Sequence, residues 1–167
     1  MEALVDCVIE DARWEGLGLE PLSLRAASAV LKGLGLPETG FTLCVMGCDD
    51  ARIAVLNAEF RGKALPTNVL SWPSEDLSEG VPGQEPARPL AGEAAEPWSL
   101  GDIAISYDTC AREAGAAGKP LADHVTHLVV HGLLHLLGYD HIDDADAALM
   151  EKHEVAILAT LGVDDPY

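Results

Sequence analysis

The chain contains the stretch His131-Gly-Leu-Leu-His-Leu-Leu-Gly-Tyr-Asp-His141, which places three histidines at relative positions 1, 5 and 11. On an α-helix, His131 and His135 lie about 40° apart around the axis and about 6 Å apart along it. Their imidazoles therefore project from one face and can share an ion at ~2.0–2.1 Å per Zn–N bond. Gly138 tolerates a left-handed helix terminus, so the chain can turn back and present His141 as a third ligand. Three protein ligands leave a fourth tetrahedral position for water, as in catalytic zinc sites.

The same spacing occurs in metzincin proteases, whose motif is H-E-x-x-H-x-x-G-x-x-H. Here Gly132 stands where those proteases carry the glutamate that acts as general base. The sequence therefore predicts the metal geometry without the protease chemistry. Histidines packed on a helix by chance are the plain alternative. It is disfavoured because four leucines surround the motif as a dry shell: Leu133, Leu134, Leu136 and Leu137. The spacing leaves zinc and another late divalent ion open.

The composition is that of one domain of ordinary size, spanning residues 1–167. The chain is 49% hydrophobic and only 5% aromatic, which suits an α/β fold rich in Leu, Ala and Val. No apolar run approaches the ~18 residues of a membrane span, and the first residues lack the basic region of a secretory signal. We therefore expect a cytoplasmic protein with reduced thiols at its four scattered cysteines, Cys7, Cys44, Cys48 and Cys110.

The net charge of −18 argues against a nucleic-acid partner, because Lys and Arg dominate phosphate binding. The acids are unevenly distributed, however. Residues 74–99 hold six acids and one base, and residues 142–167 hold seven acids and one base, which leaves −11 of the −18 in these two stretches. Residues 49–63 balance three acids with three bases, so a local basic patch remains compatible with the sequence.

Hydrophobic periodicity predicts a small mixed sheet of about four strands layered with about five helices, an α/β (α+β) fold. The expected strands are residues 2–10, 41–46, 68–72 and 103–106. The expected helices are 22–34, one capped by Asp49 or Asp50 and ended by Gly62, 108–117, 123–137, and one opened by Asp143 or Asp144. Residues 74–99 contain four prolines and three glycines without periodicity, which predicts a mobile loop insertion; a role as a lid is the less favoured alternative.

Four blocks of the chain resemble the YbeY endoribonuclease family of bacterial ribosomal-RNA maturation factors. The strongest is His127-Leu-Val-Val-His-Gly-Leu-Leu-His-Leu-Leu-Gly-Tyr-Asp-His141. The others are Leu56-Asn-Ala-Glu-Phe-Arg-Gly-Lys63 with Thr67-Asn-Val-Leu-Ser-Trp-Pro73, Leu100-Gly-Asp-Ile-Ala-Ile-Ser106, and the end of the chain from Met150. The departures are Trp72 where Phe is usual, Asn68 where Asp is common, and a longer loop before Leu100.

The resemblance implies one zinc ion on His131, His135 and His141 and a metal-dependent cleavage of single-stranded RNA. It also implies maturation of the 3′ end of the small-subunit ribosomal RNA and a role in ribosome quality control. The implied partners are ribosomal RNA, proteins of the small ribosomal subunit and the Era GTPase. The family's functional arginine corresponds to Arg61.

Arg61 is the candidate phosphate clamp and transition-state stabiliser, because a guanidinium binds phosphate through two parallel hydrogen bonds. Its plain alternative is an ordinary surface arginine. Lys63 is a weaker candidate for phosphate contact and is otherwise a solvated loop lysine. The general base is left open between water activated at the metal and a carboxylate. For Asp140 we favour a different role, orienting a ligand histidine.

Three further groups of polar residues have competing interpretations. Thr67, Asn68 and Ser71 fit substrate hydrogen bonding or simple turn chemistry. His127, one turn before His131, fits a packed or ligand-supporting residue better than a fourth ligand, and His124 and His153 are assigned to structure or solvent. Two other functions stay open: a non-catalytic ribosome assembly factor with a structural metal and, less favoured because of Gly132, a metallopeptidase.

Overall fold

Four strands form one sheet in the order β1-β2-β4-β3 in the computed structural model, which describes residues 4–78 and 80–167. The strands are β1 (Val5–Ile9), β2 (Phe41–Cys48), β3 (Val69–Pro73) and β4 (Trp98–Ser106). β1 and β4 pair with β2 in parallel, and β3 pairs antiparallel with β4. The mixed sheet predicted from the sequence is confirmed. Residues 2 and 3 of the predicted first strand lie outside the described residues.

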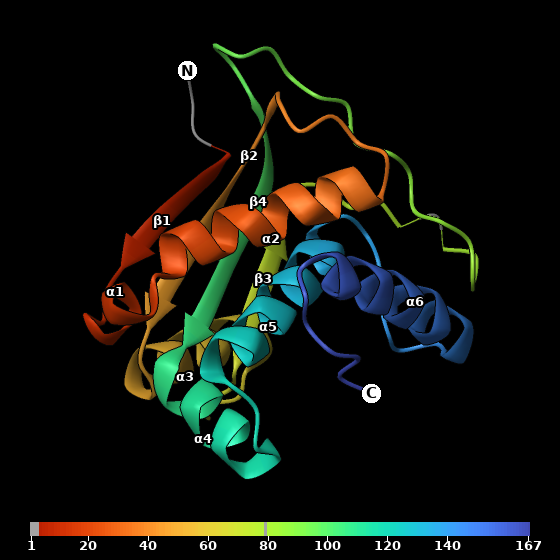
Figure 1. Ribbon diagram of the computed structural model, residues 1–167. Helices are drawn as coiled ribbons and strands as arrows, with labels where there is room; N and C mark the ends of the chain where they lie inside the picture. Colours follow the sequence, from red (N-terminus) through yellow and green to blue (C-terminus); the bar gives the residue numbers. More distant parts are fainter. Residues whose placement is uncertain (1–3, 79) are drawn as a thin grey trace.

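Six helices are described: α1 (Arg13–Leu17), α2 (Leu19–Gly33), α3 (Asp50–Arg61), α4 (Tyr107–Ala117), α5 (Leu121–Leu136) and α6 (Asp144–Thr160). α2 and α5 cover one face of the sheet, and α6 packs outside them (Figure 1). α3 lies over the opposite face, where its Ile53 packs with Cys48 of β2 and Ala104 of β4. The sheet is therefore covered by helices on both faces.

The strand alternation of β4 explains this layering. Ile103 and Ile105 belong to the main core beneath α2 and α5, whereas Ala104 between them belongs to the small core beneath α3. α5 is apolar on most of its circumference, since it lies between the sheet and α6. Truncating its buried Leu133 to Ala is expected to cost about 2–5 kcal/mol of stability. The helix that carries two of the predicted ligands is thus the buried centre of the domain.

The caps predicted for two helices are present. The Asp49 side chain accepts a hydrogen bond from the Arg52 backbone N–H at 2.9 Å and starts α3. Asp143 does the same for α6 by accepting from Ala145 N–H at 2.9 Å. α3 ends at Gly62, which has a positive φ of 72°.

Several elements differ from the prediction, and the largest differences concern α1, α2 and β4. The short helix α1 was not predicted, since five residues give too little periodicity; it buries Trp14, whose indole N–H donates to the Cys48 carbonyl at 2.9 Å. α2 begins three residues earlier than expected, at Leu19. β4 begins at Trp98 instead of residue 103, because its first residues continue the pairing with β2 up to Phe41.

The segment 74–97 forms no helix or named strand in its described part, in agreement with the predicted loop, although residues 98 and 99 belong to β4. Its side chains contact the body at several points. Leu77 is buried, Arg88 donates to the carbonyls of Leu34 and Gly35, and Glu85 accepts from Tyr139 and His153. The segment runs along the outside of the domain (Figure 1). Its mobility stays a prediction.

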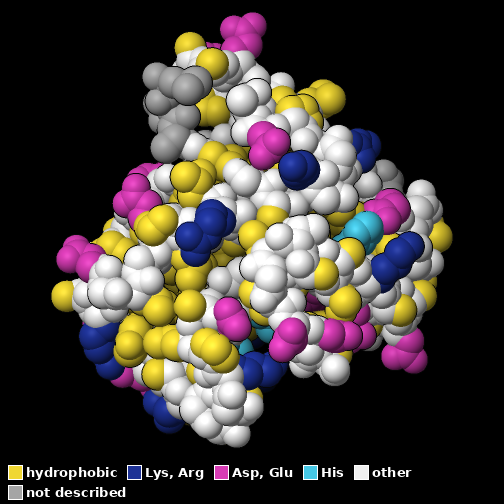
Figure 2. All heavy atoms as spheres, in the orientation of Figure 1, with side chains coloured by type: hydrophobic (Ala, Val, Ile, Leu, Met, Phe, Trp, Pro, Cys, Tyr) yellow, Lys and Arg dark blue, Asp and Glu magenta, His cyan; other side chains and the backbone are white. Residues whose placement is uncertain are grey.

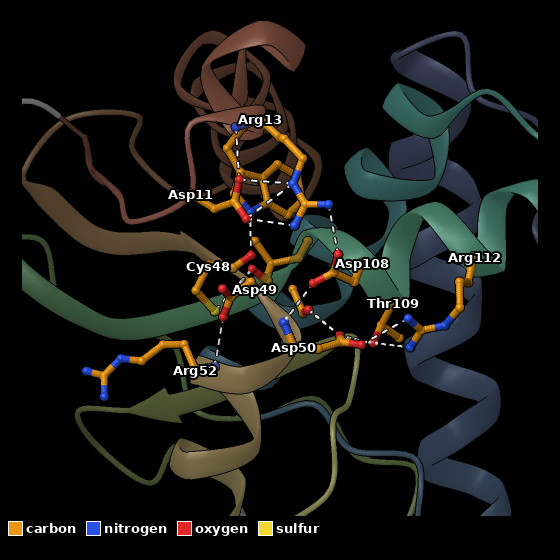
Figure 3. Close-up of polar contacts among 12 residues, drawn as sticks. Asp11, Arg13, Cys48, Asp49, Asp50, Arg52, Asp108, Thr109 and Arg112 are labelled. Carbon is orange, nitrogen blue, oxygen red and sulfur yellow. Dashed lines mark hydrogen bonds and ion pairs between the residues drawn. The ribbon is translucent and has the colours of Figure 1, made fainter.

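Ion pairs connect the carboxyl ends of the three parallel strands (Figure 3). Arg13 pairs with Asp11 at 2.7 Å and with Asp108 at 2.8 Å. Asp50 pairs with Arg112 at 2.9 Å and accepts from the hydroxyls of Ser106 and Thr109 at 2.6 Å each. We call this group the strand-end network. Each of its carboxylates has an arginine partner, which gives the network a structural role in joining α1, α3 and α4. Within the described residues, no helix has the length and apolar character to cross a bilayer.

Candidate metal centre

α5 presents His131 and His135 from one face, one turn apart, as their spacing predicts. Their Nε2 atoms lie 3.1 Å from each other. The His141 ring stacks on that of His131 with the centroids 5.2 Å apart and lies 5.0 Å from that of His135. One ligand nitrogen from each histidine lies within 4.8 Å of the other two. The structure therefore brings the three predicted ligands together.

Gly138 makes the turn that returns His141 to the helix. Its φ is 98°, a conformation that side-chain-bearing residues rarely adopt. An added Cβ would also lie 2.9 Å from Pro86 and 3.0 Å from Leu77. Both the backbone conformation and the close approach of the 74–97 segment therefore require glycine here.

The three imidazoles fit a zinc ion. Two nitrogens bound tetrahedrally at ~2.0–2.1 Å are separated by roughly 3.3 Å, close to the distance between His131 and His135. Burial and the neighbouring His131 and His141 lower the pKa of His135 to about 4. His135 is consequently neutral at pH 7, and its ring nitrogen is available as a ligand.

Glu154 of α6 fixes the ring of His131 from behind. Its side chain is 1% exposed, and its Oε1 lies 3.1 Å from His131 Nδ1, which donates to it. Its Oε2 accepts from His127 Nε2 at 2.8 Å and from the Tyr167 hydroxyl at 2.9 Å. Burial alone would raise the pKa of Glu154, but the hydrogen bonds from His127, His131 and Tyr167 lower it to about 2. An ionised Glu154 keeps the proton of His131 on Nδ1 and leaves Nε2 to face an ion.

Glu154 is therefore the carboxylate that orients a ligand ring, and the prediction that Asp140 has this role is wrong. Asp140 accepts the backbone N–H of His141 at 2.7 Å, a local bond that fixes the turn and not an imidazole. His127 supports the site through Glu154, in agreement with the prediction. His124 and His153 pair with Glu113 at 3.0 Å and Glu85 at 2.8 Å.

Gly132, at the metzincin glutamate position, is buried against β4. A Cβ added there would lie 3.3 Å from Cδ1 of Ile103. A side chain at this position would require the end of the Ile103 side chain to shift by a few tenths of an ångström, so Gly132 allows close packing of the helix on the sheet.

Two cavities flank the histidines, and both are lined by Arg61, Ser71, His135 and His141. The first, of about 300 Å³, extends over Thr67, Asn68, His127 and Tyr167, and we call it the Tyr167 cavity. The second, of about 400 Å³, extends over Phe60, Asp76, Asp140 and Ile142, and we call it the Ile142 cavity. Acidic side chains are spread over the face of the molecule shown in Figure 2, with histidine atoms visible between them.

Arg61 reaches this place because it ends α3, where Gly62 reverses the chain. It is exposed, and no hydrogen bond or ion pair holds its guanidinium among the residues that the structure describes. Lys63 is also exposed but lines neither cavity. Asn68 is already engaged, because its amide donates to Glu113 at 3.1 Å and accepts from Val69 N–H at 2.7 Å. Arg61 is thus the better placed of the two predicted substrate-binding cations.

Glu154 and Tyr167 were missed as site residues by reasoning from sequence. The pattern of α6 contains a signal for Glu154. This residue lies four positions after Met150 and four before Leu158, so all three face the buried side of the helix. A carboxylate in an apolar stripe is rarely buried without a partner. Tyr167 has no such signal, because it lies in irregular chain beyond α6.

An α/β domain with a zincin-like cluster of three histidines is the class of protein that these observations define. The family model described as Endoribonuclease YbeY matches residues 19–162, and the chain belongs to the YbeY family. The chain is 60% identical to Endoribonuclease YbeY of Cereibacter sphaeroides over all of both chains. It is also 60% identical to that of Paracoccus denitrificans, over 98% of this chain and 89% of the relative. The solution structure of TM1509 from Thermotoga maritima shares the fold at a TM-score of 0.56 and 20% identity, covering 95% of this chain and 91% of that one.

Proposed function

We propose that this protein is a metal-dependent endoribonuclease, a hydrolase that cleaves phosphodiester bonds in single-stranded ribosomal RNA. Its relatives carry the name Endoribonuclease YbeY, which supports RNA cleavage. The proposed task is maturation of the small-subunit ribosomal RNA at its 3′ end and ribosome quality control, in the cytoplasm. One observation carries the proposal: three histidine nitrogens converge in a cavity shared with Arg61, an arginine that has no ion-pair partner in the part of the chain that the structure describes.

His131, His135 and His141 are the proposed holders of one zinc ion. When bound, zinc polarises a phosphoryl oxygen and lowers the pKa of water. Glu154 keeps Nε2 of His131 directed at the ion, and the low pKa of His135 keeps that ring neutral. These ligand side chains are therefore oriented before the ion binds, so they lose little conformational freedom on binding it.

Arg61 is the proposed clamp on the scissile phosphodiester. Phosphodiester cleavage adds negative charge, and a guanidinium stabilises it with two parallel hydrogen bonds. Because no acid among the described residues pairs with Arg61, its donors are available to an incoming phosphate. The Thr67 and Ser71 hydroxyls line the same cavity and are suited to bind neighbouring phosphate or sugar oxygens. Lys63 lines neither cavity, so its proposed contact with the RNA backbone lies outside them.

The proposal is tested by metal analysis of the purified protein and by cleavage of a short, unstructured, end-labelled RNA with and without chelator. We expect close to one zinc per chain, cleavage that chelator abolishes, and recovery on adding zinc. His131→Ala should fold, as circular dichroism reports, and should lose both the metal and cleavage. His124→Ala is the matched control, because His124 lies on the same helix and outside the cluster.

Two outcomes would contradict the enzymatic proposal. If folded His131→Ala still supported ribosome maturation, the alternative of a non-catalytic assembly factor would replace it. Chelator-sensitive release of a labelled peptide, without RNA cleavage, would instead indicate a metallopeptidase. The proposed partners, small-subunit ribosomal proteins and the Era GTPase, are tested separately by pull-down with the purified protein.

A further inference from the structure

The Ile142 cavity adjoins the histidines but has a different chemical character from the Tyr167 cavity. Its lining includes the exposed apolar side chains of Phe60, 47% exposed, and Ile142, 87% exposed. Phe60 lies edge-on to Trp72 with centroids 5.2 Å apart, a contact that restricts the ring while leaving nearly half of the side chain open. Exposed aromatic and aliphatic groups next to a hydrolytic site favour a flat apolar ligand group.

Three carboxylates make the rim of this cavity acidic: Glu75, Asp76 and Asp140. Among the lining residues, Arg61 is the one Lys or Arg, and it stands at the border with the Tyr167 cavity. A phosphate would be repelled inside the Ile142 cavity, whereas a neutral group that donates N–H bonds would be attracted.

Two of these carboxylates are held in fixed orientations. Asp76 Oδ1 accepts from Ser78 N–H at 3.0 Å, and Asp140 Oδ1 accepts from His141 N–H at 2.7 Å. Within the described part of the chain, no hydrogen bond or ion pair occupies the other oxygen of either group, or either oxygen of Glu75. The rim thus offers carboxylate oxygens that have no hydrogen-bond or ion-pair partner among the described residues and can accept from a ligand.

We propose that the Ile142 cavity is a nucleobase subsite that receives the base next to the phosphodiester held at Arg61. It would prefer bases with an exocyclic amino group (guanine, adenine and cytosine) over uracil. This inference rests on the proposed function, since it names a specificity of the same site. Single-stranded bases are recognised by stacking on aromatic rings and by hydrogen bonds to their edges, and carboxylates accept from base amino groups.

The residues shared by the two cavities indicate how the RNA would be placed. Arg61, Ser71, His135 and His141 line both, so a phosphate at Arg61 leaves one attached nucleoside within reach of the Ile142 cavity. The phosphate then occupies the boundary beside the cation, and the neutral base occupies the acidic side. In this arrangement a neutral base, and not a phosphate, occupies the acidic cavity of a protein whose net charge is −18.

The test uses the full-length, zinc-loaded protein and a random-sequence pool of unstructured RNA, cleaved to a low extent, with the product ends sequenced. We expect uracil to be depleted about fivefold or more at one position beside the cut. Phe60→Ala should lower kcat/KM by roughly 5- to 150-fold, the loss expected for one base–aromatic stack. Val55→Ala is its control, because Val55 is an exposed apolar residue of the same helix that lines neither cavity.

Asp76→Asn tests the hydrogen-bond acceptor itself. The new amide oxygen can still accept from Ser78 N–H, which turns the NH₂ group toward the cavity and replaces an acceptor with a donor. The depletion of uracil should disappear or invert in the double variant Glu75→Gln/Asp76→Asn. Glu93→Gln removes a charge from the same segment, lines neither cavity, and should leave the base profile unchanged.

The outcomes separate this inference from the proposed function. Cleavage with equal base frequencies at every position near the cut would overturn the subsite and leave the nuclease proposal standing. A base preference that Glu75→Gln/Asp76→Asn does not alter would also overturn it. Absence of cleavage by the zinc-loaded protein would refute the proposed function instead.

Discussion

The strand-end network and the histidine centre are both polar clusters, but they differ in how their groups are satisfied. In the network, Arg13 lies between Asp11 and Asp108, and Arg112 pairs with Asp50, so each of these cations has a carboxylate at less than 3 Å (Figure 3). In the histidine centre, three imidazoles face one another with no described carboxylate in their group, and the acid Glu154 lies behind His131.

This difference separates a structural cluster from a candidate active site. The network lowers the pKa values of Asp11, chiefly through its hydrogen bonds to Arg13, and of Asp108, chiefly through the same guanidinium. The fold therefore satisfies these charges without any ligand. The histidine cluster instead lowers the pKa of His135 by burial and by its neighbours, which disfavours a proton and favours an ion. Arg61 shows the same contrast with Arg13 and Arg112, because no described acid pairs with it and its guanidinium is open to an anionic ligand.

The largest effect is expected from Arg61→Ala. Removing one donor that stabilises transition-state charge typically lowers the rate by about 10²- to 10³-fold, so we expect kcat/KM for RNA to fall by that order. Zinc content should not change, because Arg61 is not among the clustered ligands. Arg52→Ala is the matched control, since Arg52 lies on the same helix and pairs with Glu10 at 3.1 Å. Equal losses in the two variants would show that Arg61 acts as a surface charge.

The pH dependence of stability should also distinguish the two clusters. An unperturbed histidine has a pKa of 6.5, whereas that of His135 in the folded protein is about 4, so the metal-free protein binds fewer protons than its unfolded chain between these values. The contribution of neutral His135 to stability is complete above pH ~6.5 and is lost as pH falls through 4, a change of no more than roughly 3–4 kcal/mol. The network aspartates have lowered pKa values, so their contribution persists through this window and is lost only at more acidic pH.

Urea unfolding of the metal-free protein between pH 4 and 7 measures this difference. His135→Gln should flatten the dependence of the unfolding free energy on pH, whereas Arg13→Ala should leave its slope unchanged. A wild-type protein whose stability rises as pH falls from 6.5 to 4 would contradict the assigned direction.

Glu154→Gln tests the support behind the ligands. The amide can still accept from one histidine, but its NH₂ group then faces the donors of His127 or Tyr167. Loss of an orienting partner behind a metal ligand typically weakens metal affinity by about 10- to 100-fold, which competition with a zinc-binding dye measures. Glu151→Gln, on the exposed side of α6, should bind zinc normally. Unchanged affinity in Glu154→Gln would limit Glu154 to packing.

The sequence predicted the parts of the molecule that depend on local spacing. His131, His135 and the turn at Gly138 are encoded within eleven residues, and the caps at Asp49 and Asp143 within three. The family membership predicted from four sequence blocks is confirmed. The mixed sheet followed from alternating apolar residues, although its strand order emerged only from the structure.

The contacts that depend on tertiary packing were not predictable. Glu154 reaches His131 only because α6 packs on α5, and sequence adjacency wrongly favoured Asp140. Arg61 was predicted from the family resemblance. It precedes His131 by 70 residues, and nothing in its local sequence indicates that the two residues line the same cavity. The strand-end network was missed for the same reason: parallel pairing brings Asp11, Asp50 and Asp108 to one edge of the sheet.

The smallest effect is expected from Arg13→Ala, which breaks the strand-end network alone. Arg13 is 47% exposed at its side chain, so solvent screens its ion pairs, and the midpoint of thermal unfolding should fall only slightly. Zinc affinity and RNA cleavage should equal those of the wild type, because the network contributes no residue to either cavity beside the histidines. Side-by-side measurement of zinc content, cleavage rate and thermal midpoint in Arg13→Ala and Glu154→Gln completes the comparison. If Arg13→Ala lost zinc or activity while remaining folded, the two clusters would be coupled through the sheet, and the separation of structural from functional charge would fail.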